Sequence, residues 1–132
     1  MRVLSSPEQA TQASLTVRDL AAAAGIAASA VRFYDDNGLL ASVRTAGNQR
    51  RFYPIDACLV KIIRVAQRAG LSVAEIRALM AHLPRQRGDV TVADFGRLRA
   101  QLEADVRERI AALTNVLDDL TSERKLCDVS TE

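Results

Sequence analysis

The sequence predicts a mainly α-helical protein, in which a winged helix-turn-helix DNA-binding domain precedes one long dimerisation helix. Two short helical patterns meet at a glycine, which is typical of a helix-turn-helix. An arginine-rich stretch with a Gly-Asn turn follows them and predicts a β-hairpin, or wing. The last segment keeps an apolar stripe at helical spacing without a proline, which predicts a single long helix.

The helix-turn-helix is expected between residues 16 and 38. Thr16 and Asp19 have the spacing of a capping box, so a first helix is expected from Thr16 to Ala24. Gly25 should end it in the left-handed conformation, which glycine adopts at little cost. A second helix is expected from residues 27–29 to about residue 37, with Gly38 after it.

The wing and two further helices are expected next along the chain. Gly47-Asn48 is a turn signal between two short extended segments that carry arginines. Pro54 should open a third helix, because the first helical position needs no N–H, and Gly70 should end it. Ser72 to Glu75 repeats the capping-box pattern and predicts a fourth helix, which Pro84 stops.

The last helix is expected from a third capping box, Thr91 to Asp94, to about Lys125. Its apolar stripe consists of Phe95, Leu98, Leu102, Val106, Ile110, Leu113, Leu117 and Leu120. A helix of roughly 50 Å is too long to bury this stripe on one small domain. The stripe therefore predicts an antiparallel coiled coil between two subunits through residues 92–120; the alternative is a surface helix partly folded back onto its own domain.

The expected organisation has four parts. Residues 1–14 form a flexible tail, 15–88 the winged helix-turn-helix domain, 89–126 the dimerisation helix, and 127–132 a tail that could act as a sensor segment.

Charge divides the chain in two. Residues 1–88 hold 12 Lys and Arg against 6 Asp and Glu, whereas residues 89–132 hold 6 against 10. A basic half is expected of a surface that meets phosphates. The sequence shows neither an apolar run long enough for a membrane span nor a signal-peptide core, so a cytoplasmic protein without a membrane partner is expected.

The candidate DNA contacts lie on the second helix and the wing. Arg32 can bind guanine or phosphate, and the Tyr34 hydroxyl suits phosphate. Val31 should point inward. The expected contacts on these elements are Ser29, Arg32, Tyr34, Arg44, Asn48, Arg50, Arg51 and Tyr53.

Several of these residues belong to motifs of a known family. The motifs are Leu15-Thr-Val-Arg-Asp-Leu-Ala, Gly25-Ile, Val31-Arg-Phe-Tyr-Asp, Gly38-Leu-Leu and Arg50-Arg-Phe-Tyr. Together they resemble the MerR family of transcriptional regulators over residues 15–121. The wing and the run Ile62 to Gly70 are most similar to the SoxR-type, redox-responsive branch.

The resemblance implies a homodimer on pseudo-palindromic, double-stranded promoter DNA. An effector bound at the dimer end would let the protein bend and untwist the DNA. This distortion would bring the two promoter elements into register for RNA polymerase, which is thus a partner only indirectly. It also implies that Arg18 on the first helix holds phosphate.

The SoxR-type iron–sulfur cluster is not expected here. A [2Fe–2S] cluster needs four ligands, and the segment after the long helix offers only Cys127. No metal or other cofactor is expected either, and His82 is interpreted as a surface residue. The resemblance places Cys58 opposite the partner's sensor segment, so a Cys58–Cys127 thiol switch between subunits is one hypothesis for the effector. The reading of both cysteines as ordinary structural residues stays open.

Other functions remain as alternatives. Met80, Leu83, Phe95 and Leu98 could line a pocket for a small organic ligand, or could form ordinary core. The protein could also be an architectural DNA-binding protein or a repressor without an effector, or only a coiled-coil interaction module. An enzyme is not expected, since one histidine leaves little acid–base capacity and the adjacent pairs Asp35-Asp36 and Asp118-Asp119 should diverge.

Overall fold

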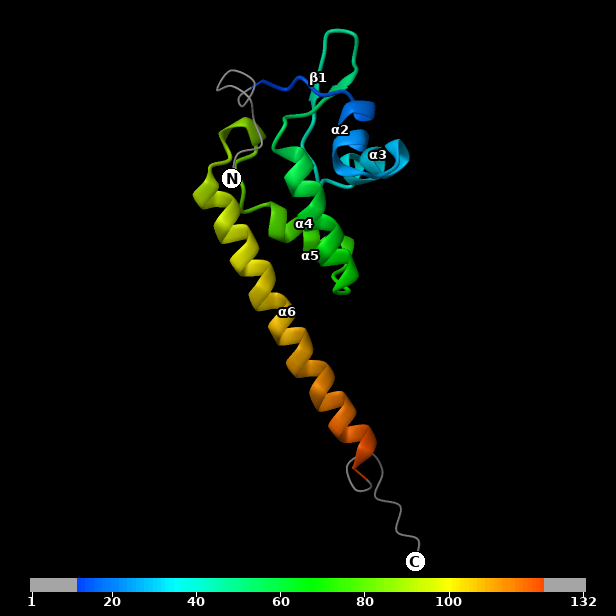
Figure 1. Ribbon diagram of the computed structural model, residues 1–132, viewed down its shortest axis with the longest axis vertical. Coiled ribbons are helices and arrows are strands. Elements are labelled where there is room, and N and C mark those ends of the chain that lie inside the picture. Colours follow the sequence, from blue (N-terminus) through cyan, green and yellow to red (C-terminus); the bar gives the residue numbers. More distant parts are fainter. Residues whose placement is uncertain (1–11, 123–132) are drawn as a thin grey trace, which may run out of the picture.

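The computed structural model describes residues 12–122. A compact group of short helices and a β-hairpin occupies one end, and one long helix runs from it to the other end (Figure 1). The elements are α2 (Val17–Ala24), α3 (Ala28–Asp36), β1 (Val43–Arg44), β2 (Arg50–Arg51), α4 (Asp56–Arg68), α5 (Val73–Met80), the 3-10 helix η1 (Arg87–Asp89) and α6 (Val92–Thr121). The expected winged helix-turn-helix followed by a long helix is confirmed.

Local signals place the ends of α2 and α3. The Thr16 hydroxyl accepts from the Asp19 N–H at 3.1 Å, and the Asp19 carboxylate accepts from the Thr16 N–H at 3.0 Å. Gly25 follows at φ +72°, and its left-handed backbone turns the chain into α3. The capping boxes expected at the starts of α5 and α6 are also present.

The structure corrects two helix ends. α4 begins at Asp56, two residues after Pro54, because Pro54 lies in a turn closed by the bond from the Asp56 N–H to the Tyr53 carbonyl. α5 ends at Met80, before Pro84, and Leu83 still reaches the core after the helix has ended.

The wing is a two-stranded antiparallel hairpin. Val43 pairs with Arg51 and Arg44 with Arg50, and Asn48 occupies the turn at φ +64°. A bridge from Leu15 to Phe52 attaches the segment before α2 to the base of the hairpin. The hairpin therefore projects from the same end of the molecule as α2 and α3 (Figure 1).

One hydrophobic core joins the helices, and α6 contributes to it. The largest fully buried apolar side chains of this core are Leu20, Val31, Leu39, Phe52, Leu59, Val60, Ile63, Ile76 and Met80. Leu98 and Leu102 of α6 are buried against the same cluster, with Phe95 and Val106 partly buried beside them. This packing ties the first turns of α6 to the domain that carries the wing.

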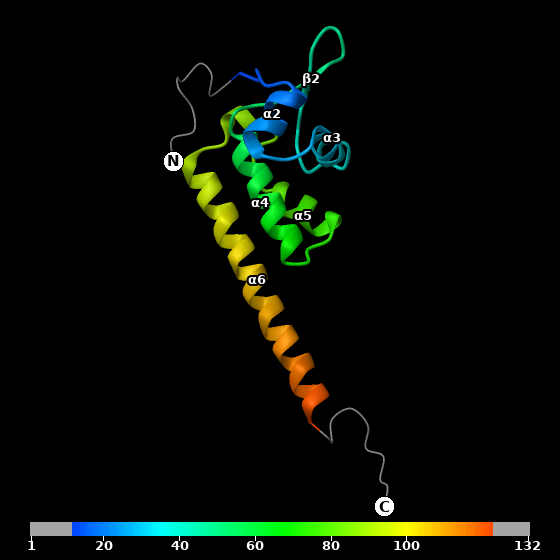
Figure 2. The ribbon, with the colours of Figure 1, turned by 45° about the vertical axis from the view of Figure 1, so that its right-hand side comes forward.

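The two halves of the α6 stripe have different environments. Ile110, Leu113, Leu117 and Leu120 are 60–67% exposed. The second half of α6 projects beyond the other helices in both views (Figures 1 and 2). The first half of the stripe is therefore covered by its own domain, while the coiled coil expected through residues 92–120 stays a prediction. No helix within residues 12–122 is long and apolar enough to cross a membrane.

Candidate DNA interface

The outward face of α3 is a narrow stripe of four side chains. Ser29, Arg32, Phe33 and Asp36 are exposed and follow one another at helical spacing, as i, i+3, i+4 and i+7. Val31 and Tyr34 are buried on the opposite side, as expected for Val31. Phe33 was not among the expected contacts, although its spacing from Ser29 could have identified it.

The structure places both tyrosines among the expected DNA contacts in the interior. Tyr34 is 5% exposed, and its hydroxyl donates to the Gln67 Oε1 of α4 at 2.9 Å. Tyr53 is 4% exposed at the base of the wing. Both rings fill the interior beside α4, which nothing in the linear sequence reveals.

Arg50 joins the wing to α3 instead of extending toward solvent. Its Nη1 lies 3.1 Å from the Asp35 Oδ2 and 2.9 Å from the Asp36 Oδ1. The expectation that these carboxylates diverge is wrong, since one guanidinium draws both together. Asp35 also accepts from the Ser42 backbone N–H and hydroxyl, so it ties the loop after α3 to the wing. Arg50 thereby offsets two negative charges at the C-terminal end of α3.

The remaining expected contacts beyond α3 lie on α2 and the wing. Arg18 is exposed on α2, and Arg44 and Asn48 are exposed on the hairpin. Arg51 is half-buried, and its guanidinium donates to the Arg50 carbonyl and the Gln49 Oε1. These two hydrogen-bond partners of Arg51 are neutral, and the positive charge of Arg51 also helps to lower the pKa of Asp19.

Comparisons with known proteins match this arrangement. A family described as "MerR HTH family regulatory protein" matches residues 15–83, and one described as "MerR, DNA binding" matches residues 59–122. The chain belongs to the MerR family. Its function is accordingly that of a DNA-binding transcriptional regulator.

Relatives of this MerR-family protein include both activators and metal-response regulators. It is 40% identical to an HTH-type transcriptional activator SoxR homolog of Chromobacterium violaceum, over 84% of this chain and 74% of that protein. It is 34% identical to a mercuric resistance operon regulatory protein of Shigella flexneri, over 78% of this chain and 69% of that protein. A solved structure of HiNmlR, a MerR family regulator lacking the sensor domain and bound to promoter DNA, aligns with a TM-score of 0.52 at 29% identity; the match covers 81% of this chain and 84% of that one.

Two ionisable side chains of this MerR-family domain, Asp56 and Arg87, are buried. Asp56 has no exposed surface, and its Oδ2 accepts the Tyr53 N–H at 2.8 Å. Arg87, 5% exposed, donates from Nη1 to the Pro84 carbonyl. Among the described residues, the Asp56 Oδ1 and the Arg87 Nε have no hydrogen-bond partner. Burial raises the pKa of Asp56 to about 7, although the Tyr53 N–H and the Arg87 charge both oppose that rise.

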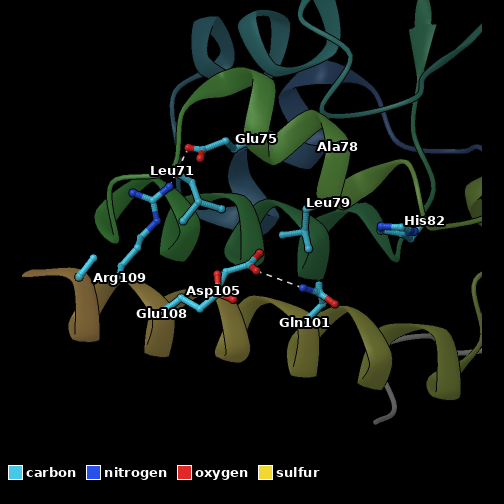
Figure 3. A pocket seen from close by; sticks show the side chains of 10 residues that line it. Leu71, Glu75, Ala78, Leu79, His82, Gln101, Asp105, Glu108 and Arg109 are labelled. Carbon is cyan, nitrogen blue, oxygen red and sulfur yellow. Dashed lines mark hydrogen bonds and ion pairs between the residues drawn. The ribbon is translucent and has the colours of Figure 1, made fainter.

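A groove of about 510 Å³ separates α5 from α6 (Figure 3). Leu71 and Leu79 line its apolar side, and Asp105 and Glu108 its acidic side. Arg109 closes one end, because it lies 2.7 Å from the Glu75 Oε1 and donates to the Gly70 carbonyl. The Arg109–Glu75 ion pair and the Arg109–Gly70 hydrogen bond connect α6 to α5 and to the turn before it.

The expected sensor and ligand residues lie apart from this groove. Cys58 is 8% exposed in the core, and burial raises the pKa of its thiol, which opposes formation of the reactive thiolate. Cys127 lies outside the described residues. Met80 is core, whereas Leu83 and Leu98 line a second groove of about 310 Å³ with His82 and Asp94. No cluster of potential metal ligands occurs in the part of the chain that the structure describes.

Proposed function

We propose that the protein is a homodimeric, sequence-specific regulator that distorts promoter DNA. The observation that carries the proposal is that α3 and the wing lie at the same end of the molecule (Figure 1), and that Ser29, Arg32 and Arg44 on these elements are exposed. In a helix-turn-helix protein the second helix lies in the major groove, and phosphate contacts from neighbouring elements set its position. RNA polymerase would respond to the changed DNA shape rather than to a direct contact.

The roles within the interface follow from what each side chain already contacts. Arg18, Ser29, Arg32, Arg44, Asn48 and Arg51 are proposed as DNA-contacting residues. Arg50, Tyr34 and Tyr53 are proposed as positioning residues, because their polar groups or rings are engaged inside the protein. Residues 15–88 form the proposed DNA-binding unit, and the α6 segment within 89–126 forms the proposed dimerisation unit. We assign no catalytic role, and we propose a cytoplasmic location because the proposed partner is promoter DNA.

The identity of the effector is a separate question. The alternatives are regulation without a dedicated effector domain, a small organic ligand, and a thiol switch. HiNmlR, the relative bound to promoter DNA, is a family member that lacks the sensor domain, which supports regulation without a dedicated effector domain. The grooves between α5 and α6 favour a small organic ligand instead, and Asp94, Asp105 and Glu108 supply carboxylates that could pair with a cationic one. The buried position of Cys58 makes the Cys58–Cys127 thiol switch the weaker proposal.

Footprinting on the DNA that flanks its own gene tests the regulatory function. A protected pseudo-palindrome with enhanced cleavage at its centre is expected, because distortion opens the central base steps. Protection without any central change would favour a purely architectural or repressor role. A footprint without any sequence preference would contradict the proposal.

Arg51→Ala is expected to weaken binding to every DNA sequence alike. Removal of one positive charge per subunit from the proposed phosphate contacts should lower the slope of log K against log salt by about one for each subunit. Fluorescence anisotropy over a salt series measures this slope. Arg107→Ala removes the same charge from α6, where it pairs with Glu103, and should leave the slope unchanged. An unaltered slope in a folded Arg51→Ala protein would remove Arg51 from the phosphate contacts.

A further inference from the structure

Phe33 is a large apolar side chain on the outward face of α3, whose other members are polar. It is 46% exposed, between Ser29 and Asp36 on the outward stripe of α3. An exposed aromatic ring forgoes the stabilisation that its burial would give, at about 25 cal/mol for each Å² of apolar surface. An apolar partner outside the chain would supply that burial.

The ring is also held in a defined position. It packs edge-on against Tyr34, with the ring centroids 6.1 Å apart and an interplanar angle of 66°. Tyr34 is itself fixed by its hydrogen bond to Gln67 of α4. Phe33 therefore projects from a rigid support, so little side-chain entropy is lost when it meets a ligand.

The charges around Phe33 suit DNA. Arg32 precedes it on the same face, and Arg50 offsets the carboxylates of Asp35 and Asp36 at the end of the helix. Without Arg50, these carboxylates would repel a phosphate backbone near the C-terminal end of α3. The surroundings of Phe33 thus favour a nucleic acid over an apolar protein partner.

Only one base presents an apolar group in the major groove. The thymine C5-methyl lies there, whereas the other base edges offer hydrogen-bond donors and acceptors. We propose that Phe33 reads a thymine methyl in each half-site and so determines specificity at that position. This inference rests on the proposed placement of α3 in the major groove.

Deoxyuridine, which differs from thymidine only by that methyl, provides the test. Duplexes bound by the full chain are first selected from random sequence at fixed salt, and each recurring thymine is then replaced by deoxyuridine in both half-sites. At one symmetric pair of positions the wild-type affinity should fall about 4-fold per half-site, and about 15-fold for the pair. Phe33→Ala should bind the thymine and deoxyuridine duplexes equally, whereas Phe33→Leu should keep part of the discrimination.

Val65→Ala is the matched control, because Val65 is similarly exposed but lies on α4. The Val65→Ala protein should distinguish the thymine duplex from the deoxyuridine duplex as well as the wild type does. Discrimination that survives in Phe33→Ala, or a wild type that never distinguishes thymine from deoxyuridine, would overturn the inference while leaving DNA binding intact. A wild type that shows no salt-dependent DNA binding would contradict the proposed function itself.

Discussion

Leu113→Asp together with Leu117→Asp is expected to convert the protein from dimer to monomer. The four exposed side chains Ile110, Leu113, Leu117 and Leu120 follow one another in steps of three, four and three, which is the spacing of a coiled-coil seam. Burial of each leucine contributes about 1.5–3 kcal/mol, and an aspartate in its place would carry an uncompensated charge into the seam. Sedimentation velocity should show a single species of monomer mass.

The same variant should lose most of its DNA affinity. Two linked DNA-binding units gain avidity of about 10²–10⁴ over one unit, so binding to a full pseudo-palindrome should fall at least 100-fold. Binding to an isolated half-site should change little, because the core of the domain contains Leu98 and Leu102 rather than the distal leucines. A half-site and a full-site probe in parallel titrations separate these two effects.

Ala111→Asp with Asn115→Asp is the matched control. It adds the same negative charge to the same turns of α6, but on the face opposite the seam. This control should remain a dimer. A Leu113→Asp/Leu117→Asp protein that sediments as the wild type does would show that the dimer, if present, uses another surface.

The second large effect concerns Asp56 and pH. The folded-state pKa of Asp56 lies at about 7, above the ordinary value of 3.8, because its carboxylate is buried. The folded protein therefore holds a proton between these values that the unfolded chain has released. The free energy of unfolding should fall as pH rises from about 4 to 7, since this contribution is fully present only below the ordinary pKa.

The size of this change makes it measurable. The interval between 3.8 and about 7 corresponds to a free energy on the order of 4 kcal/mol. Urea unfolding at a series of pH values should show the decline in the wild type and a much flatter profile in Asp56→Asn, whose amide oxygen can still accept the Tyr53 N–H. Asp89→Asn, an exposed change in the neighbouring η1, should keep the wild-type decline. An Asp56→Asn profile as steep as the wild type would show that another group takes up this proton.

Three capping carboxylates have the opposite effect on the free energy of unfolding, which they lower as the pH falls. Hydrogen bonds from the backbone at the helix starts lower the pKa values of Asp19, Glu75 and Asp94. Their stabilisation is present above their ordinary pKa values and is lost as the pH falls through the lowered ones. Stability is therefore expected to be greatest near pH 4–5, between the two opposing effects.

The order of elements and most helix ends followed from the sequence alone. Capping boxes and a left-handed glycine depend on residues only three or four positions apart. The local sequence around Thr16, Ser72, Thr91 and Gly25 is therefore enough to predict these helix ends. The apolar spacing of α6 and the basic character of residues 1–88 are likewise readable without coordinates. The MerR family followed from motifs spread over most of the chain.

Only the tertiary structure decided which polar side chains of α3 and the wing bind partners within the protein. Arg50 and Tyr34 are residue types that commonly contact DNA. In this protein, however, the Arg50 guanidinium pairs with Asp35 and Asp36, and the Tyr34 hydroxyl donates to Gln67. The sequence likewise could not divide the α6 stripe into a half that packs on its own domain and a half that is exposed. In each case the deciding partner is distant along the chain, and a side chain's environment depends on neighbours in space that periodicity and composition do not specify.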